Sequence, residues 1–213
     1  MTSQPHLVQP PPIAVWLLNL FALDEKSESI LGDLLEEFSL IASKSEAASA
    51  RRWCWRQAMK TIPPLAGVGF RSAPWMTTAA VVGGFLLRKL LGPLVEPPIF
   101  AVLERYRVFE YHFGTYMFFA STGIDIGHLI TFLFIGFVVA LVSRQREMVA
   151  TITLSLIYGV MAVVGFMYVV TTAGHGALLW RFTWVFADAF AIVIAGAVVR
   201  THRLAAPSRR SNA

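Results

Sequence analysis

Four long apolar runs dominate the chain after its first third, and they cover about residues 75–91, 116–142, 149–170 and 178–199. The hydrocarbon core of a bilayer is about 30 Å thick, so a helix needs roughly 20 apolar residues to cross it. The runs lack the two-residue alternation of barrel strands, whereas a helix satisfies its backbone hydrogen bonds internally. The pattern therefore predicts an all-α, polytopic membrane protein with four transmembrane helices.

The first of these runs is the weakest. Arg88 and Lys89 interrupt it, and Gly92-Pro93 predicts that the helix ends there. Whether residues 75–91 cross the whole bilayer is left open by the sequence. An amphipathic stretch follows, which we expect to lie along the membrane surface before the second span; its apolar members are Ile99, Val102, Leu103, Tyr106 and Phe109.

A different pattern precedes the spans. Apolar residues recur at intervals of three and four from Ile30 to Ile41, which predicts a helix with one buried face. A second helix is predicted from about Ser45 to Thr61, where Pro63-Pro64 ends it. The first helix is acidic and the second is basic. We therefore expect a short cytosolic helical hairpin in which the charges of the two helices face each other.

These patterns divide the chain into four parts. Residues 1–12, with four prolines, are expected to form a mobile leader, and residues 13–72 a cytosolic helical prefix domain. The apolar run 13–23 is interpreted as a short packing or interfacial helix of that domain, because no basic residue precedes it as in a secretion signal. Residues 73–200 form the four-helix transmembrane domain, and residues 201–213 a basic cytosolic tail.

Lysine and arginine are unevenly divided between the two ends of the predicted spans, and such residues concentrate on the cytoplasmic side of a membrane. Eleven fall on the side of the amino terminus: Arg51, Arg52, Arg56, Lys60, Arg71, Arg144, Arg146, Arg200, Arg203, Arg209 and Arg210. Five fall on the opposite side: Arg88, Lys89, Arg105, Arg107 and Arg181. We therefore expect both termini in the cytoplasm. This topology explains the net charge of +5 without a nucleic-acid partner.

Composition and motifs exclude several classes of protein. With 56% hydrophobic and 15% charged residues, the chain is neither a disordered segment nor a water-soluble domain. Its single cysteine, Cys54, excludes a disulfide scaffold. The sequence contains no phosphate-binding glycine loop with its lysine, no nucleophilic serine in an elbow and no His-Glu-x-x-His. We therefore expect no enzymatic activity and no cofactor.

Two motifs of the predicted hairpin are familiar. Ile30-Leu-Gly-Asp-Leu-Leu-Glu-Glu-Phe38, followed by Ala50-Arg-Arg-Trp-Cys-Trp-Arg-Gln57, resembles the permease prefix domain at the start of bacterial ABC permeases of the macrolide-exporter type, especially acidobacterial ones. The resemblance covers about residues 11–62, and Cys54 stands where an aromatic residue is usual. It implies a bacterial inner-membrane location and a link with transport complexes. In those relatives a permease with a large extracytoplasmic domain follows the prefix. We expect this chain to be a stand-alone membrane protein without that permease core, so export activity is not implied.

The same motifs mark a candidate interaction surface on the prefix domain. Its tryptophan and arginine residues either pack the hairpin and rest on lipid headgroups, or form a docking surface for a partner protein. Gly32 is expected to let the two helices approach closely. The residues of this surface are Gly32, Asp33, Glu36, Glu37, Arg51, Arg52, Trp53, Trp55 and Arg56.

Ionisable residues inside the spans mark a second candidate site, because charge in hydrocarbon is costly. Asp125 and His128 are three residues apart and share one helix face. The expected topology gathers five such residues toward the outer leaflet: Asp125, His128, His175, Arg181 and Asp188. Either these groups specify how the helices pack, or they form a proton relay or a cation site. Asp-x-x-His supplies only two metal ligands, so no metal site is expected.

The sequence thus favours a non-enzymatic accessory or interaction protein of the inner membrane, whose prefix domain binds a transport component or another cytosolic partner. The alternative is a small transporter, or an ion- or proton-responsive membrane protein, that uses Asp125, His128 and Asp188. Under both hypotheses the lipid bilayer surrounds the spans.

Overall fold

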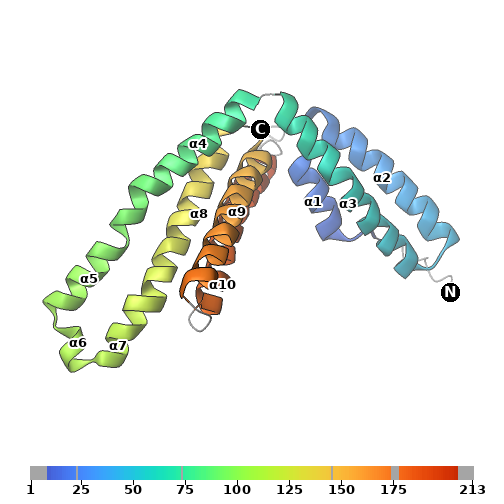
Figure 1. The fold of residues 1–213 in the computed structure, drawn as a ribbon. Helices are drawn as coiled ribbons and strands as arrows, with labels where there is room; N and C mark the ends of the chain where they lie inside the picture. The colour runs from blue at the N-terminus through green and yellow to red at the C-terminus, as the bar shows by residue number, and fades with distance from the viewer. Residues whose placement is uncertain (1–8, 23, 73, 145, 174–177, 206–213) are drawn as a thin grey trace, which may run out of the picture. The chain divides into compact units, whose positions relative to one another are not determined.

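The computed structural model describes residues 9–22, 24–72, 74–144, 146–173 and 178–205. Every element in these residues is helical (Figure 1). The chain divides into two compact units, Met1–Pro74 and Trp75–Ala213. Most of the predicted leader and most of the predicted tail lie outside the described residues.

The first unit is a bundle of three helices, which we call the head. The predicted helix pair is present as α2 (Asp24–Lys44) and α3 (Ala47–Ser72). α1 (Pro12–Phe21) packs against both, and most closely against α3, where alanine and cysteine recur every four residues and leave room for it. The run 13–23 is therefore a packing helix. The buried residues between the three helices are Ala14, Leu18, Leu34, Phe38, Ala50, Cys54 and Ala58.

α3 extends beyond the point at which the sequence predicts its end. It contains Pro63 and Pro64 and continues to Ser72, so the predicted end near Thr61 is wrong. A proline has no N–H for the carbonyl four residues before it. Those carbonyls belong to Met59 and Lys60, which are exposed, so water can bond to them and lower the cost of the two prolines.

The second unit contains four helical spans that are long and apolar enough to cross a membrane, and the predicted all-α membrane architecture is confirmed. They cover Pro74–Arg105, Phe113–Val142, Glu147–Tyr168 and Thr183–Ala205. Their main helices are α4 (Pro74–Leu91) and α5 (Glu96–Arg105), α7 (Phe113–Phe118) and α8 (Ile124–Val142), α9 (Glu147–Ala173), and α10 (Leu178–Ala205). A π-helical turn, η2 (Phe119–Gly123), joins α7 to α8.

The first span is longer than the sequence indicates. A single 3-10 turn, η1 (Gly92–Leu94), connects α4 to α5, and α5 follows in the same direction (Figure 1). The stretch from Ile99 to Arg105, expected to lie along the membrane surface, instead prolongs the span. The prolines are accommodated because they stand in the first turns of η1 and α5, where their missing N–H is not needed. The chain turns at Arg107, with φ 52°, and enters α6 (Val108–Tyr111).

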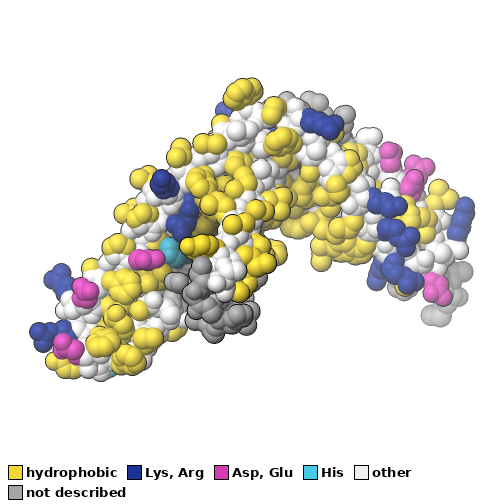
Figure 2. Space-filling view, viewed as in Figure 1, with side chains coloured by type: hydrophobic (Ala, Val, Ile, Leu, Met, Phe, Trp, Pro, Cys, Tyr) yellow, Lys and Arg dark blue, Asp and Glu magenta, His cyan; other side chains and the backbone are white. Residues whose placement is uncertain are grey.

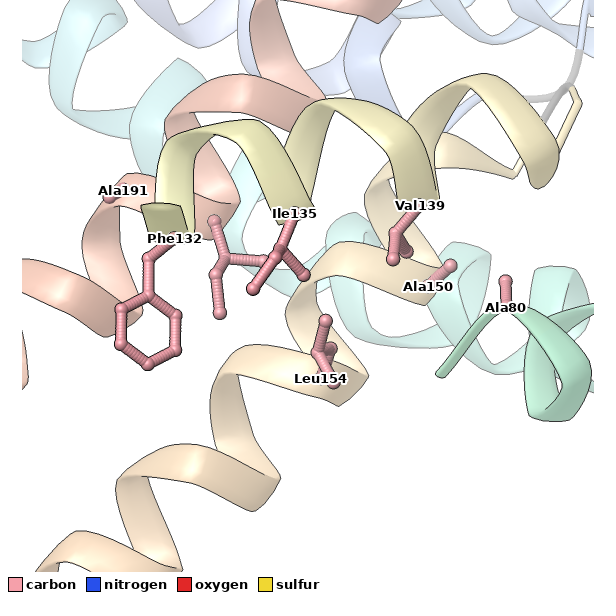
Figure 3. Packing of buried hydrophobic residues seen from close by; sticks show 8 residues of the cluster. Ala80, Phe132, Ile135, Val139, Ala150, Leu154 and Ala191 are labelled. Atoms are coloured by element: carbon pink, nitrogen blue, oxygen red, sulfur yellow. The ribbon is translucent and has the colours of Figure 1, made fainter. Parts of the chain in front are cut away.

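α8 and α10 form the central contact of this unit, and α9 packs beside both. Their buried side chains interdigitate with one residue of α4 (Figure 3); the cluster consists of Ala80, Phe132, Ile135, Val139, Ala150, Leu154, Ala191 and Ile192. Glycines allow the closest approaches. A Cβ at Gly136 would lie 2.7 Å from the Ile192 Cα, and one at Gly84 would lie 2.7 Å from Val139. Hydrophobic side chains also cover the outer faces of the spans (Figure 2). Such faces are typical of helices in contact with lipid.

Candidate functional site

The polar residues within the spans meet around Arg88 of α4. Arg88 is roughly 20 Å of helix away from Pro74, which places it near the middle of the first span. Its Nη2 lies 3.4 Å from His128 Nδ1, and its guanidinium carbon lies 5.0 Å from the centre of the Phe132 ring. A Cβ at Gly92 would collide with Nη1, so glycine provides the space that the guanidinium occupies.

His128 connects the first span to α8. Its Nδ1 faces Arg88, and its Nε2 lies 3.5 Å from Oε1 of Glu96, the first residue of α5. The His128 side chain is 18% exposed, whereas Glu96 is mostly exposed. Because a guanidinium only donates, Nδ1 is the acceptor in this contact, and the ring proton on Nε2 faces the carboxylate. The imidazole therefore bridges a fixed cation and an anion.

The two carboxylates inside the spans also belong to this neighbourhood. Asp125 lies in the first turn of α8, and Asp188 lies in α10. The charges of Arg88 and Asp125 both act on the Asp188 carboxylate. Within the part of the chain that the structure describes, the buried Oδ1 of Asp188 has no hydrogen-bond partner. Arg88 thus contacts His128 and acts on Asp188, so these groups lie in one neighbourhood of the spans.

Two members of the predicted layer are not seen there. His175 lies outside the described residues, and Arg181 lies in α10 with its side chain outside them. Two further residues, Arg88 and Glu96, join the cluster although the sequence did not place them in it. The sequence signal for Arg88 was its position within an apolar run. From the sequence, Arg88 counts with the basic residues of the far side, because Gly92-Pro93 predicts the end of the helix four residues later.

A cavity of about 420 Å³ opens beside Arg88, between α4 and α9. The hydroxyl of Tyr158 is buried and bonds to no other group among the described residues. The Tyr158 ring packs edge-on against Phe132, with 5.1 Å between ring centres. The cavity is lined by Phe85, Arg88, Lys89, Pro93, Tyr158 and Met161. Two cationic side chains and a phenol thus face one space within the spans.

The predicted interaction surface on the head is exposed and charged. Arg51, Arg52 and Arg56 are exposed along α3, where basic side chains gather in Figure 2. The carboxylates of α2 that were expected to face them, Asp33, Glu36 and Glu37, are exposed too. In the described parts of α2 and α3, no ion pair joins the two sets of charges. The helices meet through apolar side chains, so the charges remain in solvent instead of facing each other.

Other residues of this surface have different roles. Trp53 and Trp55 are half-buried and pack against the head core, while Cys54 between them is fully buried. Burial raises the pKa of the Cys54 thiol. Gly32 is exposed, and a Cβ there would meet no atom within 4 Å. The expected close approach at Gly32 is therefore wrong; the alanines of α3 provide it instead.

Comparison of the chain with protein families, with curated proteins and with solved structures finds no match. The chemistry of its residues is therefore the basis for interpretation. Among the described residues, no three His, Cys, Asp or Glu side chains are grouped as a metal site would need. The cluster in the spans offers proton donors and acceptors around a permanent cation, and the head offers an exposed basic face.

Proposed function

We propose that this chain is a non-enzymatic accessory protein of a bacterial inner membrane. Its four spans anchor the head, and the head binds a component of an ABC-type export complex on the cytoplasmic side. The observation that carries this proposal is the basic face of α3, which forms no ion pair with the carboxylates that the structure describes.

Arg52 and Arg56 lie one helical turn apart, and both are exposed. The core of the head consists of apolar residues, so neither guanidinium contributes to its packing. Arginine and tryptophan are enriched among the residues that dominate binding energy, and complementary charge directs the choice of partner. The resemblance of the α2 and α3 motifs to the permease prefix domain supports a transport component as that partner.

Charge reversal combined with crosslinking in intact cells tests this proposal. A photoreactive amino acid replaces Arg51, and crosslinked proteins are identified in the parent, in Arg52→Glu/Arg56→Glu and in Lys44→Glu. Lys44 is exposed at the end of α2 and serves as the charge-matched control. We expect an export permease or its ATPase from the parent and the control, and at least about tenfold less from the double variant. Equal capture by all three, or no transport component in any, would contradict the proposal.

A second candidate function is a response to protons within the spans. It is favoured by the contact of Arg88 with His128 and by the charge of Arg88 that acts on Asp188 of the fourth span. Such groups relay protons in many membrane proteins. In proteoliposomes with an imposed pH gradient, we expect proton flux in the parent and its loss in Asp188→Asn and His128→Gln. The control is Glu104→Gln, an exposed carboxylate of α5. Absence of proton flux in the parent would contradict this function and would indicate that these residues act only in helix packing.

A further inference from the structure

A second ionic cluster lies at the opposite end of the spans from the turn at Arg107. The second span ends there at Val142, the third begins at Glu147, and the fourth ends at Ala205. We infer that these three span ends mark the membrane surface, where phospholipid headgroups lie. This cluster is separate from the groups around Arg88.

Glu147 is the centre of this cluster. Its side chain is fully buried, and its Oε1 accepts a hydrogen bond from Arg203 Nη1. Arg200 is 1% exposed, and its Nη1 lies 3.8 Å from the second oxygen, Oε2. Arg146 precedes Glu147 and is half-buried; its Nη1 is buried and finds no hydrogen-bond partner in the described parts of the chain. Two guanidinium groups thus lie beside one carboxylate, and a third belongs to the residue that precedes it in the chain.

Among the side chains that the structure describes, positive charge exceeds negative charge in this cluster. Guanidinium groups keep their proton in proteins, so Arg146, Arg200 and Arg203 each carry a positive charge. Glu147 is the only acidic side chain in residues 140–150 and 196–205. It also stands in the first turn of α9, whose amino end adds about half a positive charge. The carboxyl ends of α8 and α10 contribute about half a negative charge each, which offsets only part of the excess.

Burying unbalanced charge is unfavourable, and a bound anion would remove the imbalance. We propose that the cluster of Arg146, Glu147, Arg200 and Arg203 binds a phosphate group. This chemistry is shared by the headgroup of an anionic phospholipid and by free inorganic phosphate. The planar guanidinium fork matches the oxygens of a phosphate and bonds to two of them at once. Arg203, whose side chain is 35% exposed, opens the cluster to the membrane surface.

Thermal unfolding of the full chain in a neutral detergent tests the proposal. Phosphatidylglycerol is compared with phosphatidylcholine, and inorganic phosphate is compared with chloride at equal ionic strength. We expect phosphatidylglycerol, inorganic phosphate or both to raise the melting temperature above the value measured with the respective control. Stabilisation by phosphatidylglycerol alone identifies a lipid headgroup, whereas equal stabilisation by inorganic phosphate identifies the free ion. Stabilisation by neither would overturn the proposal.

Variants locate the site. Arg146→Gln and Arg203→Gln should each weaken the apparent affinity about tenfold, because each removes one charge-assisted contact. Arg105→Gln removes the same charge from an exposed position at the other end of the spans and should leave the affinity unchanged. Equal effects of all three variants, or no effect of the first two, would refute a built site. Native mass spectrometry of the parent, with retained phosphatidylglycerol or phosphate as the expected result, gives a check that needs no variant.

Discussion

Arg88 and Lys89 are neighbours in the sequence and both line the cavity between α4 and α9, yet they differ in burial. Lys89 is exposed, whereas Arg88 is half-buried, contacts His128 and acts on Asp188. A lone charge at this depth is costly, and surrounding it with an imidazole, an aromatic ring and carboxylates lowers that cost. Arg88 is therefore tolerated in the span because of its partners.

We expect Arg88→Met to destabilise the spans by about 1–3 kcal/mol, because it removes the cation whose charge acts on the carboxylate of Asp188. In the Asp188→Asn background the same change should cost less, since that carboxylate is gone. The free energy of unfolding of the four proteins in detergent measures this coupling. Lys89→Met is the control and should have a small effect. Strictly additive changes would show that Arg88 and Asp188 do not interact.

Cys54 provides a pH-dependent prediction for the head. Burial raises its pKa above the ordinary value of 9.0, so the folded head holds the thiol proton more tightly than the unfolded chain does. The proton on this thiol therefore stabilises the folded head. The stabilisation is complete below the pKa of the thiol in the unfolded chain, and it is lost as the pH rises through the pKa of the thiol in the folded head. We expect slow alkylation of Cys54 by N-ethylmaleimide in the native protein at pH 8, at least about tenfold slower than in denaturant. Equal rates would show that the core of the head is open.

At the scale of elements, glycine determines where the helices cross. The Cβ that alanine adds at Gly136 of α8 would lie 2.7 Å from the Ile192 Cα and 2.8 Å from its carbonyl oxygen on α10. Backbone atoms cannot move aside as the end of a flexible side chain can. Gly159 of α9 is the matched control, since a Cβ there meets nothing within 4 Å.

We therefore expect Gly136→Ala to destabilise the spans by about 1–3 kcal/mol through overpacking. Gly159→Ala should be neutral or stabilising by up to about 1 kcal/mol, because alanine is the better helix former. Unfolding in detergent, followed by circular dichroism, compares the two variants. A Gly136→Ala protein as stable as the parent would mean that α8 and α10 cross elsewhere.

Elements also show which sequence signals are reliable. The periodicity from Ile30 to Ile41 predicted α2, because the apolar spacing of a helix is a local property. The end of α3 was predicted wrongly from Pro63-Pro64. The end of α4 at Leu91 agrees with the prediction from Gly92-Pro93, but the helical run does not stop there, because η1 leads into α5. Proline weakens a helix by a few kcal/mol, and exposed carbonyls or a single 3-10 turn can absorb that cost.

At the scale of the whole molecule, the longer first span alters the charge argument for topology. Arg88, Lys89 and Arg105 lie within that span, and Arg200 and Arg203 lie within the fourth, so all five leave the count of basic residues near the span ends. Arg107 and Arg181 remain on the far side, against nine residues on the side of the amino terminus. The asymmetry that favours cytoplasmic termini is therefore stronger than the sequence alone suggests.

Reporter fusions test this orientation. Alkaline phosphatase inserted after Arg107, in the turn between α5 and α6, should be active outside the cytoplasm. Green fluorescent protein at the carboxyl end should fluoresce, which requires the cytoplasm. Activity of both reporters on one side of the membrane would contradict a four-span topology with both ends inside.

The sequence by itself determined the helical class, the four spans and the helices of the head. These follow from hydrophobicity and its periodicity, which depend on residues close together in the sequence and not on contacts between distant helices. It also identified Asp125, His128 and Asp188 as costly groups within lipid. Only the tertiary structure decided which charges they meet, and that Glu147 and Arg200 are buried together. Burial of a charge depends on partners contributed by helices distant in sequence, and no local pattern encodes that arrangement.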